Sequence, residues 1–192
     1  MPEIGKPVVE QKAGDQPSRD LTERALHFRI RQQEILAELG VFALQGTEFM
    51  ELLNHVVSLT AEGLEAEYCK VLEYLPAKNR LLVRAGVGWG EGVVGSATVG
   101  ADLASPAGFA LHTGKPVISN HLENEQRFRT PELLVEHGIR RAMNVILQGD
   151  GSPFGVLEVD SKSEGDFPGK AIAFLQGARK IIRMDTARPC SH

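Results

Sequence analysis

Two apolar segments near the end of the chain are separated by a very short turn, and this spacing constrains the fold more than any other feature. The first segment spans residues 141–148 and the second spans residues 154–159. Between them lies Gly149-Asp-Gly-Ser-Pro153, which is rich in turn-forming residues. Parallel strands need a crossover of a dozen or more residues, so this connection predicts an antiparallel hairpin.

A second hairpin is predicted earlier in the chain. Residues 68–75 are rich in aromatic and branched side chains, residues 76–80 have turn chemistry, and residues 81–87 resume an apolar run. The following residues 86–100 contain six glycines, each of which costs about 1 kcal/mol in a helix relative to alanine. This segment is therefore expected to form a tightly turned or mobile loop.

Helices are predicted at both ends of this strand region. A helix over residues 20–44, capped by Ser18 or Asp20, has a seam at three- and four-residue spacing: Leu21, Ala25, Phe28, Gln32, Ile35, Leu39 and Phe42. The seam either docks on its own domain or joins two copies, and Gly40 is expected to interrupt it. Further helices are expected over residues 48–63, with Thr47 as the cap, and over residues 170–183, with short helices after Ser105 and Thr130.

The order of these elements predicts an α+β fold, in which a central antiparallel sheet is flanked by N- and C-terminal helices. Residues 1–19 are expected to be a disordered tail, residues 20–44 the N-terminal helix, residues 45–184 the domain, and residues 185–192 a polar tail.

Composition narrows the function classes. The chain has 192 residues, a net charge of −4 and no concentrated basic face, which argues against nucleic-acid binding. No stretch approaches the length of a membrane span, and two cysteines do not form a disulfide framework. The expected location is the cytoplasm.

Three separated segments together resemble a GAF domain. They are the stretch from Ser105 through Thr113-Gly-Lys-Pro-Val117 to Asn120, then Gln126-Arg-Phe128, and then residues 141–147 with Pro153-Phe-Gly-Val-Leu-Glu-Val-Asp-Ser161. The resemblance covers residues 45–165 and looks closest to the sensor segments of bacterial histidine kinases. It implies a PAS-like antiparallel sheet with helices on one face, a ligand pocket on the other face, and dimerisation through flanking helices.

The resemblance stops short of a complete kinase. The sequence has no phosphoacceptor-histidine helix or ATP-binding domain, and the apolar pattern of the last helix fades after residue 178. Two alternatives stay open: the protein acts on a signalling protein in trans, or it is a truncated part of a larger sensor.

Catalytic and cofactor motifs are weak. Gly90-Glu-Gly92-Val-Val-Gly95 matches a dinucleotide-binding pattern but lacks a convincing following helix. The six histidines have no metal-ligand spacing, and no serine lies in a nucleophile motif. Family members that reduce free methionine sulfoxide use several cysteines, whereas only Cys69 is near the implied pocket. We therefore expect no catalytic activity and no metal site, and we identify no cofactor.

The pocket candidates follow from the geometry of the family. They are Trp89, Phe109, His121, Phe128, Met143 and Asp160. Glu158 and Asp160 are two residues apart on a predicted strand, so both side chains should point to the same face. The sequence thus indicates a module that senses a small molecule and dimerises through its helices. The alternatives are a redox enzyme of the free methionine sulfoxide reductase type and an interaction module with an empty pocket.

Overall fold

The computed structural model describes residues 16–186 and contains one six-stranded antiparallel sheet. The two predicted hairpins are confirmed, and β1 pairs with β6 to join them in the order β3-β2-β1-β6-β5-β4. The α+β class is therefore confirmed. The strands are β1 (Tyr68–Leu75), β2 (Arg80–Val87), β3 (Thr98–Gly100), β4 (Val117–Ser119), β5 (Arg141–Gln148) and β6 (Pro153–Ser161).

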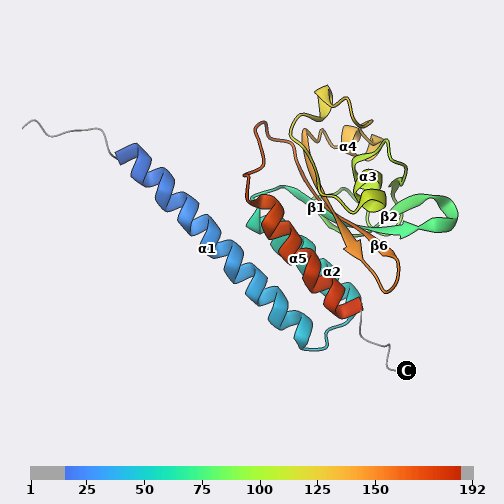
Figure 1. Cartoon of the computed structure of the whole chain (residues 1–192), viewed down its shortest axis with the longest axis horizontal. Coiled ribbons are helices and arrows are strands. Elements are labelled where there is room, and N and C mark those ends of the chain that lie inside the picture. Colours follow the sequence, from blue (N-terminus) through green and yellow to red (C-terminus); the bar gives the residue numbers. More distant parts are fainter. Residues whose placement is uncertain (1–15, 187–192) are drawn as a thin grey trace, which may run out of the picture.

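Helices cover both faces of this sheet (Figure 1). Three long helices lie on one face, where α2 and α5 contact the strands and α1 packs on both of them. Two shorter helices lie on the other face, together with the loops. The helices are α1 (Gln16–Leu44), α2 (Phe49–Gly63), α3 (Pro106–Thr113), α4 (Glu132–Glu136) and α5 (Ala171–Thr186), with 3-10 turns at Pro76–Lys78 and Leu122–Asn124.

The larger core lies between the sheet and the long helices. Alternate residues along each strand face this core, as the pleat of a β-strand requires. Those from β1, β5 and β6 are Cys69, Val71, Met143, Val145, Leu147, Leu157 and Val159. The side chains between them point to the opposite face, which α3 and α4 cover.

The seam of α1 divides into two parts. Gln32, Ile35 and Leu39 are buried against the domain, and the amide of Gln32 donates to the carbonyl of Gly63 at 2.9 Å. This bond explains the polar seam position. The N-terminal half of α1 extends past α5 (Figure 1), and there Leu21 is 68% exposed. The predicted interruption at Gly40 is not observed, since α1 runs through it.

Two expectations about helix ends need correction. Residues 16–19, assigned to the tail, begin α1, where Pro17 fits the first turn because that turn has no need of its N–H. Thr47 does not cap α2: its hydroxyl donates to the carbonyl of Phe42 and so closes the end of α1. The predicted cap at Ser105 is confirmed, because its hydroxyl accepts from the N–H of Gly108 at 3.1 Å.

None of the helices described in residues 16–186 is long and apolar enough to cross a membrane. Residues 1–15 and 187–192, which include most of the predicted tails, lie outside the described part of the chain.

Candidate functional site

A cluster of charged and amide side chains is buried on the sheet face that α3 and α4 cover. The register places Lys70 of β1 opposite Glu158 of β6, and Glu158 opposite Asn144 of β5. Asp160 lies two residues further along β6, on the same face as predicted. Each of the four side chains is at most 2% exposed. We call Lys70, Asn144, Glu158 and Asp160 the buried polar cluster.

Lys70 holds the two acids together. Its Nζ lies 2.7 Å from Oε1 of Glu158 and 2.5 Å from Oδ2 of Asp160. Burial opposes the charged ammonium, but the two carboxylates outweigh it and raise the pKa of Lys70. Burial, reinforced by the charge of Glu158, raises the pKa of Asp160 well above its usual range.

Three polar atoms of this cluster have no hydrogen-bond partner among the described residues. They are both amide atoms of Asn144 and Oδ1 of Asp160. An unpartnered buried polar group costs about 1–3 kcal/mol, and native proteins contain few of them. These atoms are free to bond to a molecule bound beside the sheet.

Aromatic rings cover one end of the cluster. The ring centroid of Trp89 lies 4.2 Å from Nζ of Lys70, a cation–π contact, and its indole N–H donates to the carbonyl of Cys69 at 3.1 Å. The rings of Tyr68 and His137 lie 4.8 Å and 4.9 Å from that of Trp89. Trp89 follows β2 in the glycine-rich segment, so a loop supplies this cover.

A second aromatic pair lies beyond the other end of the cluster. Val117 of β4 lies opposite Asn144, and it packs with Phe109 and Phe128. The centroids of these two rings are 5.3 Å apart. Trp89 and the phenylalanine pair thus lie at opposite ends of one row of side chains that crosses the sheet.

The structure places the six pocket candidates in four different surroundings. Trp89 and Asp160 meet at Lys70, while Phe109 and Phe128 lie beyond Asn144. The other two candidates lie elsewhere.

The structure places Met143 on the other face of the sheet. It pairs with Val159, is fully buried, and faces α2 and α5, because neighbouring residues of a strand point to opposite faces. Its neighbour Asn144 has the position on the site face.

His121 also lies away from the cluster. It is exposed, 3.7 Å from Oδ1 of Asp166, and lines a surface hollow of about 340 Å³ with Glu123. Of four surface hollows on the described residues, none is lined by Lys70, Glu158 or Asp160.

Cys69 lies on the other face of β1 from Lys70. Its side chain is fully buried against the long helices, and burial raises the pKa of its thiol far above the usual range. A thiol in this position is a poor nucleophile. Within residues 16–186, no group of three or more His, Cys, Asp or Glu side chains is placed to hold a metal ion.

Gly86 controls the position of Trp89. A Cβ at this position would lie 2.8 Å from Cδ1 of the indole, so we expect Gly86→Ala to displace the ring and destabilise the fold by about 1–3 kcal/mol. Trp89 is the only tryptophan, so its fluorescence emission should shift to longer wavelength. Gly40→Ala is the matched control, since nothing lies within 4 Å of the added atom. An unchanged emission spectrum in the Gly86→Ala variant would contradict the assigned packing.

Hydrogen bonds of Glu125 with Arg127 and Ser119 position Phe128, and we call these three residues the Glu125 clasp. Arg127 donates to Oε1 of Glu125 at 2.9 Å and to the carbonyl of Ile118 at 2.7 Å, and it lies over the ring of Phe128. Ser119 donates to the same carboxylate at 2.7 Å. The bond from Arg127 is the main cause that lowers the pKa of Glu125 to about 2.

The clasp predicts a pH dependence. The folded pKa of Glu125 is below its ordinary value of 4.5, so ionised Glu125 stabilises the fold above that value and this contribution is lost as the pH falls towards about 2. A ¹³C NMR titration of the Glu125 carboxyl should show the low pKa, and Arg127→Ala should raise it. Equal values in both proteins would refute the clasp.

Comparison with known proteins gives one family. The GAF domain profile matches residues 48–180. Solved structures with similar folds include the GAF domain of an Acinetobacter phosphoenolpyruvate-protein phosphotransferase, with 18% identity, a TM-score of 0.69, and coverage of 81% of this chain and 92% of that one. The corresponding GAF domain from Coxiella burnetii has 15% identity, a TM-score of 0.73 and coverage of 82% and 94%.

A third similar structure is an enzyme. It is the free methionine-R-sulfoxide reductase of Neisseria meningitidis in complex with its substrate, with 16% identity, a TM-score of 0.67, and coverage of 81% of this chain and 87% of that one. No curated protein matches the sequence. At these identities the similar structures establish the fold alone.

Proposed function

The chain belongs to the GAF domain family, and on that premise we propose that it is a regulatory module in bacterial signal transduction that senses a small molecule and has no catalytic activity of its own. One observation carries the proposal. Asn144 is completely buried in the buried polar cluster, and neither polar atom of its amide has a hydrogen-bond partner among the described residues.

The chemistry of the cluster indicates a class of ligand. The amide of Asn144 presents a donor and an acceptor side by side, which complements a molecule with adjacent N–H and carbonyl groups. Oδ1 of Asp160 is a further free site. Trp89 and Phe128 provide apolar walls at the two ends. A compact polar molecule with an amide-like edge therefore fits best, and it enters when the glycine-rich segment that carries Trp89 moves.

The same strands connect this site to the helices. On β1, β5 and β6, the residues between those of the buried polar cluster pack against α2 and α5. A ligand that bonds to the cluster in one arrangement of the strands would favour that arrangement, and the packing of the helices would follow. We propose that the output reaches a signalling protein in trans, in the cytoplasm.

The position of Cys69 supports a role without catalysis. A redox enzyme of the reductase type remains the alternative, because one structurally similar protein is such an enzyme. The test is turnover of free methionine-R-sulfoxide with a thiol reductant. We expect no turnover; turnover by the wild type that is lost in Cys69→Ser would favour the alternative.

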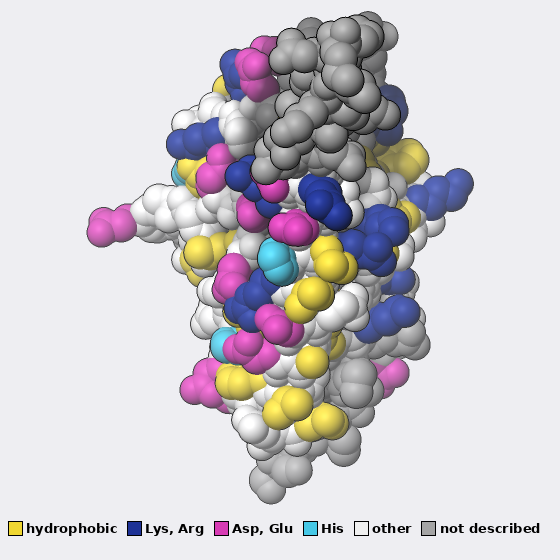
Figure 2. All heavy atoms as spheres, turned by 90° about the vertical axis from the view of Figure 1, so that its left-hand side faces the viewer, with side chains coloured by type: hydrophobic (Ala, Val, Ile, Leu, Met, Phe, Trp, Pro, Cys, Tyr) yellow, Lys and Arg dark blue, Asp and Glu magenta, His cyan; other side chains and the backbone are white. Residues whose placement is uncertain are grey.

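We further propose that two copies associate through the uncovered part of α1. Leu21, Leu26 and Ile30 are 68%, 56% and 47% exposed, and Figure 2 shows hydrophobic side chains among the charges on the side of the molecule that α1 occupies. Leu26→Glu with Ile30→Glu should halve the mass measured by light scattering. Val135→Glu, at an exposed hydrophobic residue of α4, should leave the mass unchanged. A wild-type monomer would refute this association.

A thermal-shift screen tests ligand sensing. Small molecules with an amide-like edge should include compounds that raise the melting temperature of the wild type and leave that of Asn144→Leu unchanged. Compounds that stabilise both proteins equally would place the site elsewhere and contradict the proposal.

A further inference from the structure

Part of β5 forms an unpaired edge of the sheet, at which Val145, Ile146 and Leu147 are 1%, 4% and 1% exposed. β4 pairs with residues 142–144 of β5, so residues 145–148 have no neighbouring strand on that side within the described chain. The residue before β4 is Pro116, which would be next to pair with β5. It has no N–H to donate, so the pairing does not extend to residue 145. An open edge presents main-chain groups that can pair with another extended segment.

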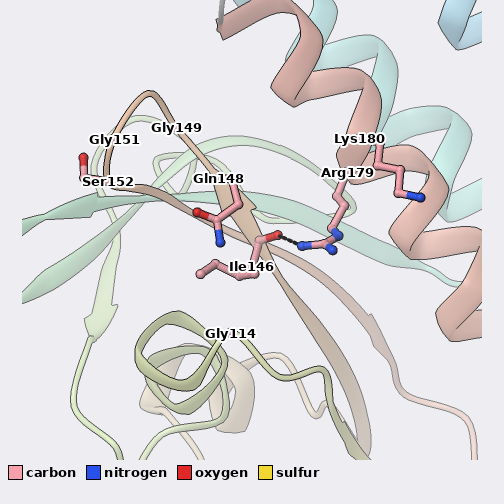
Figure 3. Close-up of a pocket in the computed structure, with 8 residues that line it drawn as sticks. All are labelled: Gly114, Ile146, Gln148, Gly149, Gly151, Ser152, Arg179 and Lys180. Atoms are coloured by element: carbon pink, nitrogen blue, oxygen red, sulfur yellow. Dashed lines mark hydrogen bonds between the residues drawn. The ribbon is translucent and has the colours of Figure 1, made fainter.

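An arginine of α5 covers this edge. Nη1 of Arg179 donates to the carbonyl of Ile146 at 3.1 Å (Figure 3). The guanidinium thus takes the position that the N–H of an added strand would occupy. Nε of the same side chain is buried and has no hydrogen-bond partner among the described residues. A buried cationic donor without a partner favours an anionic acceptor.

A surface hollow of about 560 Å³ lies along the edge. Figure 3 shows Arg179 directed towards Ile146, whereas the side chain of Lys180 points away. None of the lining residues is acidic, and Arg179 is the basic residue directed towards the edge. The lining residues are Gly114, Ile146, Gln148, Gly149, Gly151, Ser152, Arg179 and Lys180.

We propose that this edge binds an extended acidic segment of a partner protein as an additional strand. A main-chain N–H of the partner replaces Arg179 at the carbonyl of Ile146. The released guanidinium then pairs with a carboxylate side chain of the partner, to which it can donate two parallel hydrogen bonds. The unpaired main-chain groups of this edge favour a peptide over a small anion. Because Arg179 belongs to α5, the partner would contact the last helix directly.

Binding of a short peptide to the full ¹⁵N-labelled chain tests this proposal. The probe is the peptide acetyl-Thr-Val-Glu-Val-Thr-amide. A control peptide has Gln in place of Glu. The Glu peptide should shift the amide signals of residues 145–148 and slow their hydrogen exchange. The Gln peptide should bind about tenfold or more weakly, because it lacks the charged hydrogen bond.

Two variants separate the contribution of Arg179 to peptide binding from that of Lys180. Arg179→Met should weaken binding of the Glu peptide about tenfold, whereas Lys180→Met should change it little because that side chain points away. Equal binding of both peptides to the wild type would overturn the proposal even if Arg179→Met fails to fold. The same shifts with inorganic phosphate alone would also overturn it, since they would indicate a small-anion site.

Discussion

Replacing Lys70 with methionine is expected to lower the free energy of unfolding by about 3–5 kcal/mol, because the change leaves two buried carboxyls without their counter-ion. The melting temperature of a chain of this size should fall by roughly 6–20 °C. Urea denaturation followed by circular dichroism measures the change.

A triple variant is the control for this prediction. Lys70→Met combined with Glu158→Leu and Asp160→Leu removes the buried charges together and should recover most of the lost stability. A single Lys70→Met variant as stable as the wild type would show that the ammonium does not bridge the two carboxyls.

Replacing Asn144 with leucine is expected to have the opposite effect on stability. The change removes a buried amide that has no partner, so the ligand-free protein should gain about 1–3 kcal/mol in unfolding free energy. Binding of the small molecule should fall at least tenfold, because leucine offers neither donor nor acceptor. Chemical denaturation and calorimetric titration measure the two effects.

Met143→Leu is the matched control, since it changes the adjacent residue on the other face of β5 with little change of volume. It should cost less than about 1.5 kcal/mol and leave binding unchanged. A loss of stability in Asn144→Leu with unchanged binding would mean that the amide serves the fold and not a ligand.

The sheet could be predicted because local turns determine it. The turn at residues 149–152 leaves no room for a crossover, and the same holds for the turn after residue 75, so both hairpins followed from the sequence. The alternation of a strand also placed Glu158 and Asp160 on one face. These inferences need only neighbours in sequence.

The site was harder because it depends on which residues oppose each other across strands. The sequence indicated the acids of β6 but not Lys70, which comes from a strand 88 residues away and lies within an apolar run. Met143 was a pocket candidate from the geometry of the family. Pairing residues outward from the 149–152 turn without a bulge would have brought Met143 opposite Glu158. The register shift between Leu147 and Gln148 brings Asn144 there instead and leaves Met143 on the other face, and nothing in the sequence indicated this shift.

Two features could not be derived from local pattern at all. Whether the seam of α1 docks or dimerises depends on how far the domain extends along the helix, and the structure shows cover for Gln32 and Ile35 but not for Leu21. His121 resembled a pocket residue by position, yet the loop after β4 leaves it at the surface, 3.7 Å from Asp166.

Native mass spectrometry of the freshly purified wild type and Asn144→Leu tests the central claim most directly. We predict that the wild-type spectrum contains a species with the added mass of a small molecule and that the variant lacks it. Two spectra with the same species, whether both proteins carry the molecule or neither does, would contradict a ligand site at the buried polar cluster.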